Sequence, residues 1–435
     1  METNWPSVAI LALITAAAAR IGRWWFKRWF NPFTIYSVIW GFCLCNYELR
    51  LLQYESISMS AWIYIFVAWV CLYLGAATVL HLGNTSIRSD EPLLDVDIGR
   101  LKVAITVLSA IGIIAVVDQA IVLQRYFGNV FTAVLFQPGD VYGGRITNEF
   151  VFMPYAGPCL LAGAGLSGIY IAATGKFSVR AVAPLILEVL RNILAMSRGG
   201  VVIAGFMFLI CFVYTPRKWR FKVAKWQLAT GMILASVLLV GQVIFVSATR
   251  GLEVDFPGRT DAMDAISEYV PIFPSIYSNF SATPVAFSMY LATPQEARQG
   301  FWGMHTFAPI FRILGKLGFG TDVEAREENY YTPVPMNTST YLRDIDSDFG
   351  ISGVVLFPYA LGLLTAYFFR KIRQKPSVLF ILLLADFSLL MASSYAINLM
   401  FMGDWYVITI AGAICALAVR KSARAQCGTV PAFPN

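Results

Sequence analysis

The sequence predicts an all-α polytopic membrane protein, on the basis of its composition and of the apolar stretches that recur along it. Hydrophobic residues make up 57% of the 435 residues and charged residues 14%, and the mean hydropathy is +0.63. Several stretches are long enough to cross the roughly 30 Å hydrocarbon core as helices, which takes about 20 residues each. The sequence lacks the short alternating runs typical of membrane β-barrels, so we expect the spans to be helices.

Eleven apolar segments are predicted to span the membrane. The first has no basic n-region and no clear small-residue cleavage site, so we expect a retained span rather than a signal peptide. In chain order the predicted spans are 5–19, 32–48, 60–82, 101–122, 150–173, 181–197, 199–215, 228–248, 349–369, 378–400 and 404–419.

Basic residues predict the orientation of these spans. Under this count every strongly basic segment falls on the same side: 20–28, 176–180, 217–225, 370–375 and the tail from Arg420. By the positive-inside rule that side is the cytoplasm, which leaves the N-terminus outside and the C-terminus inside. The formal net charge of +7 therefore reflects membrane orientation, and we expect no nucleic-acid partner.

The predicted topology divides the chain into three parts. Residues 1–248 hold the first eight spans, 249–348 form a large outer loop, and 349–435 hold the last three spans and the cytoplasmic tail. The loop is far too long for a simple connector, and such loops are often lids or binding loops. We expect it to be partly helical, for example over 307–317, and to fold over the membrane surface.

Four arginines lie in the outer loops or at the outer ends of spans: Arg145, Arg198, Arg250 and Arg343. Each guanidinium is a planar, permanently charged fork of donors that matches phosphate oxygens. Each arginine could instead snorkel to lipid headgroups or form a salt bridge. Because the positive-inside rule disfavours arginine on the outer face, we interpret the four as candidate diphosphate ligands.

A dense charged stretch precedes the ninth predicted span. Arg343 is followed by Asp344, Asp346 and Asp348, and the next 21 residues carry no charge. A carboxylate there could act as a general base on a hydroxyl group. Asp348 also suits the cap of a helix N-terminus.

Other polar and aromatic residues have two possible roles each. His305 titrates in the range of a general base, but it also fits packing within an aromatic loop. Tyr330, Tyr331 and Tyr341 could stack on sugar rings or anchor the loop in the interface. Glu188 and Arg191, three residues apart on the sixth predicted span, are expected to form an ion pair, with the polar wall of a cavity as the alternative.

The chain resembles a known family at several short motifs. They are Asn337-Thr338-Ser339-Thr340-Tyr341-Leu342-Arg343-Asp344 followed by Asp348-Phe349-Gly350 and Gly353, then Ser197-Arg198-Gly199, His305-Thr306-Phe307 with the glycine-rich run 315–320, and Asn31-Pro32-Phe33. These motifs, with many spans and one large outer loop, are similar to the Wzy-type oligosaccharide repeat unit polymerases, which include bacterial O-antigen polymerases.

The resemblance implies a glycosyltransferase of GT-C-like architecture in the bacterial cytoplasmic membrane, with its active site facing the periplasm. Such an enzyme transfers the growing glycan from undecaprenyl diphosphate to a new lipid-linked repeat unit. It works without a metal or another cofactor, and the seven cysteines likewise show no metal-ligand spacing. The implied partners are lipid-linked glycans, membrane lipids and a chain-length regulator. The diphosphate ligands would be Arg198, Arg250, Arg343 and Arg145, and the base would be Asp348 or Asp344, with His305 behind them.

Three alternatives stay open at this point. One is a purely structural or regulatory subunit, which would not need outer arginines held by glycine turns. An O-antigen ligase-type glycosyltransferase would use the same donor with a lipid A core acceptor. A flippase for lipid-linked oligosaccharides would be expected to show internal repeats and polar residues through the full membrane depth. Charge in this sequence concentrates at one face instead, which favours catalysis over transport.

Overall fold

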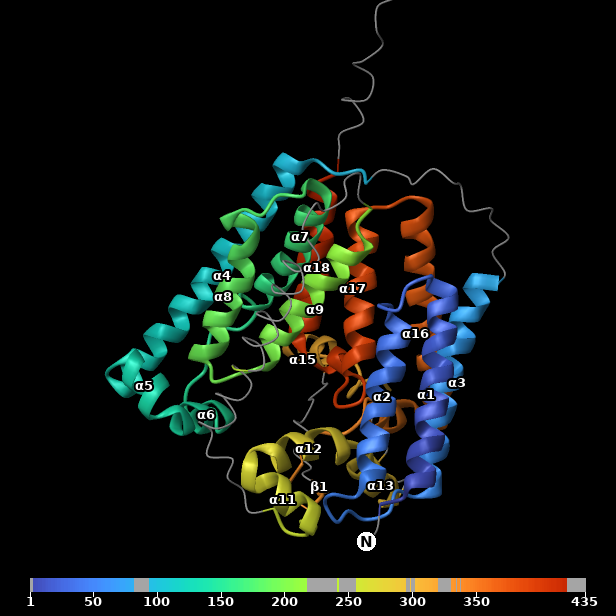
Figure 1. Ribbon diagram of the computed structural model, residues 1–435. Helices are drawn as coiled ribbons and strands as arrows, with labels where there is room; N and C mark the ends of the chain where they lie inside the picture. Colours follow the sequence, from blue (N-terminus) through green and yellow to red (C-terminus); the bar gives the residue numbers. More distant parts are fainter. Residues whose placement is uncertain are drawn as a thin grey trace, which may run out of the picture. The chain divides into compact units, whose positions relative to one another are not determined.

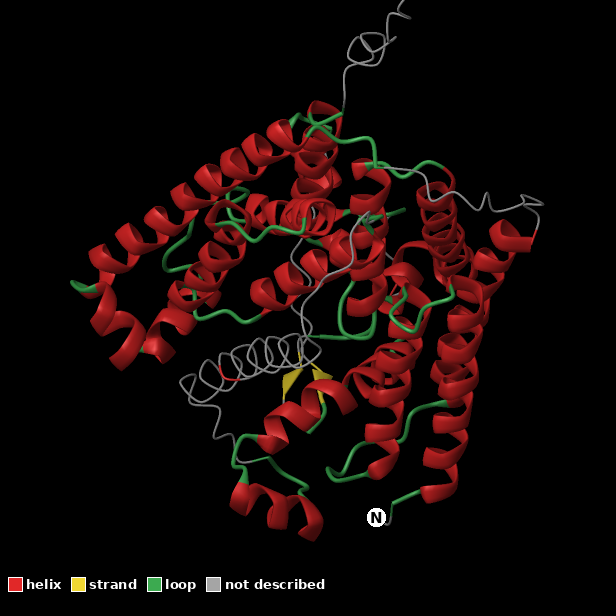
Figure 2. Ribbon diagram, turned by 45° about the horizontal axis from the view of Figure 1, so that its top comes forward, coloured by secondary structure: helices red, strands yellow, loops and turns green. Residues whose placement is uncertain are grey.

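The computed structural model describes residues 3–81, 94–216, 241, 256–294, 298, 302–319, 330–333, 335–336 and 338–420. These residues form mainly α-helices joined by short connections (Figures 1 and 2). The described part contains one small sheet, in which β1 (Tyr330–Tyr331) pairs antiparallel with β2 (Pro335–Met336). The prediction of an all-α chain is confirmed.

The chain forms two compact units, each made of segments that lie far apart in the sequence. The first unit comprises Met1–Thr85, Val243–Tyr367 and Phe387–Tyr406, and the second comprises Ser86–Gln242, Phe368–Asp386 and Val407–Asn435. These two units are defined by which residues pack together. The division predicted from the sequence, into spans and an outer loop, is defined by membrane topology and stays a prediction.

The first unit contains three long helices from the start of the chain and several short ones. They are α1 (Trp5–Phe26), α2 (Pro32–Leu49), α3 (Met59–His81), α11 (Asp261–Tyr269), α12 (Phe273–Ser281), α13 (Thr283–Ala292), α15 (Ala308–Lys316), the 3-10 helix η1 (Leu399–Phe401) and most of α16 (Leu342–Gln374). The α2 start follows local chemistry, because Asn31 caps the Thr34 N–H and Pro32 occupies the first helical position. The helix α15 confirms the predicted helical run in the large loop.

Glycine lets α3 and α16 approach closely within the first unit. A Cβ at Gly75 would lie 1.9 Å from the Tyr359 carbonyl oxygen, and a Cβ at Gly362 would lie 1.9 Å from the Leu72 carbonyl oxygen. Close backbone packing through small residues is typical of membrane helices. Lipid tails are as apolar as the side chains, so the hydrophobic effect does not drive helices together within the bilayer.

The second unit is built around α7 (Pro158–Thr174), whose residues 158–172 are all buried. It packs against α4 (Ile98–Phe127), α8 (Val179–Leu194) and α9 (Gly199–Tyr214). The short helices α5 (Val130–Phe136) and α6 (Pro138–Ile146) follow α4. The helices α17 (Val378–Ser393) and α18 (Gly403–Ala418) contribute to both units, as does α16.

Ten of the eleven predicted spans coincide with helices, and 228–248 lies outside the described residues apart from position 241. The main differences are at helix ends. The helix of the fifth predicted span, α7, begins at Pro158 rather than 150, and α17 ends at Ser393 rather than 400. Another difference is at α16, which begins at Leu342 instead of 349 and therefore includes the charged stretch.

Four described helices are long and apolar enough to cross a membrane: α1, α3, α4 and α16. The helices α7, α9, α17 and α18 are apolar but shorter. The membrane character of the chain rests on these helices. The number of eleven spans and their orientation stay predictions.

Candidate functional site

The first turns of α16 carry three buried carboxylates. Asp344 and Asp346 are each 7% exposed, and Asp348 is 4% exposed. Burying a charged carboxylate is costly unless the group is paired or hydrogen-bonded. Each of the three has such partners in the first unit, and together with Arg298 and Arg343 they form what we call the α16 charged cluster.

Asp346 is the most strongly paired member of this cluster. Arg298 Nη1 lies 2.7 Å from Asp346 Oδ2, and the Tyr290 hydroxyl donates to the same oxygen over 3.1 Å. The guanidinium carbon of Arg298 also lies 5.2 Å from the centre of the Tyr290 ring. The short distance and the burial of both partners are typical of a strong charge-assisted bond. This pair fixes residue 298 against α16.

Arg298 was missed at the level of the sequence. The other arginines were selected because they lie beside glycines or at the end of a predicted span, and Arg298 does neither. Its partner Asp346 lies 48 residues away. The only signal was indirect, because three carboxylates on one helix cannot all be buried without cationic or polar partners.

Asp348 binds a loop through both of its carboxylate oxygens. The backbone N–H of His305 donates to Oδ1 over 3.0 Å, and that of Thr306 donates to Oδ2 over 2.5 Å. The Thr306 hydroxyl donates to the Asp344 carbonyl oxygen over 3.5 Å. Asp348 therefore anchors the turn at 302–307 to α16. A capping carboxylate would accept from the first N–H groups of its own span. Asp348 instead accepts from the N–H groups of His305 and Thr306, which belong to the loop.

Arg343 is held less tightly. Its Nε lies 3.4 Å from Asp344 Oδ1, which is long for an ion pair. Its Nη1 is buried and makes no hydrogen bond to any residue that the structure describes. Since a guanidinium has five N–H donors, Arg343 retains donor capacity for a ligand.

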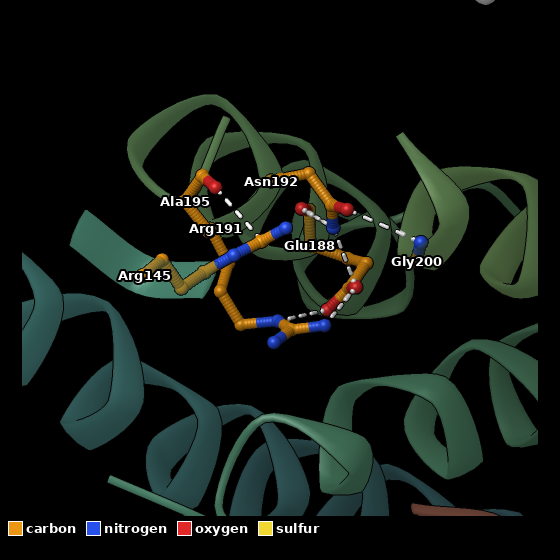
Figure 3. Close-up of polar contacts among 6 residues, drawn as sticks. All are labelled: Arg145, Glu188, Arg191, Asn192, Ala195 and Gly200. Atoms are coloured by element: carbon orange, nitrogen blue, oxygen red, sulfur yellow. Dashed lines mark hydrogen bonds and ion pairs between the residues drawn. The ribbon is translucent and has the colours of Figure 1, made fainter. Parts of the chain in front are cut away.

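A second polar cluster lies in the second unit, at the ends of α8 and α9 that the turn 195–198 joins (Figure 3). We call it the α8–α9 cluster. Glu188 is completely buried and binds Arg191 with both oxygens, over 2.6 Å to Nη2 and 2.9 Å to Nε. The Asn192 amide donates to Glu188 Oε1 over 2.6 Å and accepts from the Gly200 N–H over 3.1 Å. The predicted Glu188–Arg191 ion pair is confirmed.

Glycine is required where α9 meets this cluster. A Cβ at Gly200 would lie 2.0 Å from Glu188 Oε1 and 2.5 Å from Asn192 Nδ2. A Cβ at Gly157 would lie 2.8 Å from Arg191 Nη1. A side chain at Gly200 would therefore displace the buried Glu188 and Asn192 groups, and one at Gly157 would require the Arg191 guanidinium to shift.

Arg145 reaches the same cluster from α6. Its Nη1 donates to the Ala195 carbonyl oxygen over 2.9 Å, as Figure 3 shows, and its guanidinium carbon lies 5.6 Å from the centre of the Tyr142 ring. Burial lowers the pKa of the Arg145 guanidinium; Tyr142 opposes this shift, and the positive charge of Arg191 adds to it. No ion pair joins Arg145 to a carboxylate within the described ranges.

The turn between α8 and α9 carries Arg198. It is held by the Arg145 bond to Ala195 and by the Ser197 N–H, which donates to the Asn192 carbonyl oxygen over 2.8 Å. Met196 has a positive φ of 46° in this turn, and its side chain is fully buried in the apolar core beneath it. The sequence-predicted Arg145 thus lies in one cluster with Arg191, and Arg198 lies on the turn that Arg145 contacts.

The other predicted site residues are distributed differently. Arg343 belongs to the first unit, and Arg250 lies outside the described residues. Tyr330 and Tyr331 form β1, with Tyr331 68% exposed. Tyr341 is 1% exposed, and its ring packs on neighbouring aromatic rings, so it offers no face to a sugar in this structure.

No family model, no curated protein and no solved structure matched this chain. Among the described residues, no group of three His, Cys, Asp or Glu side chains is placed to hold a metal ion. What the two clusters offer chemically is therefore guanidinium donors, buried carboxylates and backbone N–H groups. Such groups bind anions and transfer protons.

Proposed function

We propose that this chain is a glycosyltransferase of the bacterial cytoplasmic membrane that polymerises undecaprenyl diphosphate-linked oligosaccharide repeat units. At the periplasmic face, an acceptor hydroxyl on the new lipid-linked unit attacks the anomeric carbon of the growing glycan. The bond from that carbon to the diphosphate oxygen breaks, and undecaprenyl diphosphate leaves with the electron pair. A carboxylate of the protein takes the hydroxyl proton. No metal or cofactor takes part in the proposed reaction.

The observation that carries the proposal is the environment of the Arg145 guanidinium. This guanidinium is partly buried beside a second cation, Arg191, and has no carboxylate partner in the described part of the second unit. A buried charge of this kind is costly, and a bound anion would remove the cost. A diphosphate leaving group gains negative charge in the transition state, so fixed guanidinium donors would stabilise that state more than the ground state.

The start of α9 supports anion binding at the same place. The Arg198 side chain at the N-cap position makes no capping hydrogen bond, and among the first N–H groups that of Gly200 is bonded to Asn192 Oδ1. A Cβ at Gly199 would meet nothing within 4 Å, so the space beside this residue is open. The remaining N–H groups and the helix dipole make such an N-terminus favourable for phosphate. We assign Arg145, Arg191 and Arg198 to the diphosphate.

The predicted carboxylates Asp344 and Asp348 are the candidates for the base, and both are buried in the first unit. A base needs a lone pair directed at the proton that it removes, and both oxygens of Asp348 accept backbone N–H groups. His305 follows them as a candidate, and Arg343 would bind phosphate oxygens within the first unit.

The test is a polymerisation assay with purified protein in nanodiscs. Undecaprenyl diphosphate-linked repeat units from the host are supplied, and both glycan length and released carrier are followed. The wild type should give a ladder of lengthened glycan, and Arg145→Ala, Arg198→Ala and Asp344→Asn should lose it while staying folded. Arg125→Ala is the matched control, because Arg125 is exposed at the end of α4.

The rival activities give different products in the same assay. Transbilayer movement of intact substrate without lengthening would refute the polymerase and indicate a flippase. Transfer of glycan only to a lipid A core acceptor would indicate a ligase.

A further inference from the structure

A groove of about 720 Å³ runs beside α16 in the first unit. One wall is α16 itself, from Ser347 to Phe357, and the other is formed by Trp302 and Phe307 of the anchored turn. The volume lies within the range of small-molecule sites, roughly 300–1,000 Å³. At about 1.5 Å per helical residue, the part of the α16 wall from Ile351 to Phe357 is about 10 Å long.

The two ends of this groove differ in chemistry. Ser347 and Asp348 line its first part, and Arg343 lies one helical turn before Ser347, on the same side of α16. Toward the other end, Ile351 is 61% exposed and Leu356 is 64% exposed. The groove therefore passes from donors and acceptors to exposed hydrocarbon along one helix.

Gly350 separates the two parts. Its φ of 59° and ψ of −154° interrupt α16 in a backbone region that is essentially restricted to glycine. The break lies between the last carboxylate of the charged cluster and the first exposed apolar residue of the groove. It allows both parts of the helix to line a single groove.

The aromatic wall is held in place by the charged cluster. Asp348 binds the N–H groups of His305 and Thr306, at the centre of the turn that carries Trp302 and Phe307. The Trp302 ring meets Phe349 of α16 edge to face, with centroids 5.8 Å apart. Trp302 is nevertheless 78% exposed, so most of its surface is available to a ligand.

We infer that this groove binds the polyprenyl chain of a phosphate-bearing lipid, with the phosphate at the Arg343 end and the chain along Ile351 and Leu356. A free phosphate would not use the apolar part, and a plain hydrocarbon would leave the buried Nη1 of Arg343 unbonded. An amphiphile satisfies both parts. The choice of a polyprenyl rather than a fatty acyl chain rests on the proposed function.

In this arrangement Asp348 is a positioning residue. Its carboxylate does not touch the chain, but it fixes the turn that brings Trp302 over α16. Asp348→Asn keeps the size of the side chain and replaces one acceptor oxygen with an NH₂ group. One of the two backbone N–H groups then loses its acceptor, and the aromatic wall should loosen.

Photolabelling with a sugar-free probe tests the inference. A polyprenyl phosphate with a diazirine within its hydrocarbon chain, a few isoprene units from the phosphate, is added to protein in phosphatidylcholine nanodiscs and irradiated, and the label is located by mass spectrometry of peptides. Labels should concentrate on Trp302 and on 351–356. Trp302→Ala should lower labelling of α16 roughly three- to tenfold, the size expected for a lost aromatic contact. Trp24→Ala is the control, because Trp24 is also exposed, at 59%, and lies on α1.

Other outcomes would overturn the inference. Labels spread evenly over exposed apolar positions such as Leu13, which is 71% exposed, would mean ordinary lipid contact. Equal labelling by phosphatidic acid with the same diazirine would assign the groove to membrane phospholipid. If the protein forms glycan ladders but the groove is not labelled, this inference alone is refuted. If the groove is labelled but no ladder forms, the proposed function alone is refuted.

Discussion

Replacement of Glu188 by Gln tests the α8–α9 cluster most sharply. The carboxylate is fully buried, and its oxygens accept three hydrogen bonds, two from Arg191 and one from Asn192, at 2.6 to 2.9 Å. Glutamine has nearly the same shape but carries no charge and turns one acceptor into a donor. That NH₂ group would face either a guanidinium or an amide donor, and Arg191 would lose its counter-charge.

The expected loss of stability follows from this geometry. Removing one partner of a buried ion pair costs about 3–5 kcal/mol, because the other charge is left uncompensated. The Arg191 side chain is 18% exposed, so it keeps part of its hydration. We therefore expect a value near the lower limit, about 3 kcal/mol, which is a large fraction of the roughly 5–15 kcal/mol that stabilises a typical domain.

The assay is denaturant unfolding of purified protein in detergent, with the midpoint and slope measured for Glu188→Gln, Arg191→Gln and the double variant. The double variant should lose clearly less stability than the sum of the two single changes, since neither charge is then left alone. Glu149→Gln, at an exposed position, is the control. If Glu188→Gln unfolds within about 0.5 kcal/mol of the wild type, as surface changes usually do, the buried pair does not hold this cluster together.

Three further changes have definite expected results. Gly200→Ala should destabilise the protein about as much as Glu188→Gln, since its Cβ would lie 2.0 Å from Glu188 Oε1. The control is Gly205→Ala, whose Cβ would meet nothing within 4 Å and which should be neutral or stabilise by up to about 1 kcal/mol. Gly350→Ala should cost about 1–3 kcal/mol in the same unfolding assay, and wild-type stability would contradict the observed backbone break. Arg145→Ala should remove the part of the calorimetric binding of a short polyprenyl diphosphate that belongs to the α8–α9 cluster and leave binding in the α16 groove, and unchanged stoichiometry and affinity would exclude Arg145 as a ligand.

Much of the helical architecture could be predicted from the sequence, because the length of an apolar stretch is a local property. The third span was predicted at 60–82 and α3 covers Met59–His81. The α16 start was misplaced because three carboxylates and an arginine at 343–348 resemble a solvated loop. They lie inside a helix because partners such as Arg298 and the His305 N–H compensate them, and those partners are distant in sequence.

The candidate site was predictable only in part. Arg145 and Arg198 could be selected because arginine on the predicted outer face is unusual, and Glu188 with Arg191 because their spacing places them on one helix face. The sequence could not show that Arg145 joins this pair, since the bond to the Ala195 carbonyl depends on how α6 packs beside the α8–α9 turn. Nor could it show which of the aspartates of α16 anchors the turn at 302–307.

The most direct test of the central claim is the product of the wild-type protein alone. Purified protein in nanodiscs is given undecaprenyl diphosphate-linked repeat units, and the lipid-linked glycan is separated by length while the free carrier is quantified. Polymerisation predicts a ladder spaced by one repeat unit, with one undecaprenyl diphosphate released for each new linkage. Substrate that stays at its original length, with no carrier released by folded protein, would contradict the proposed function.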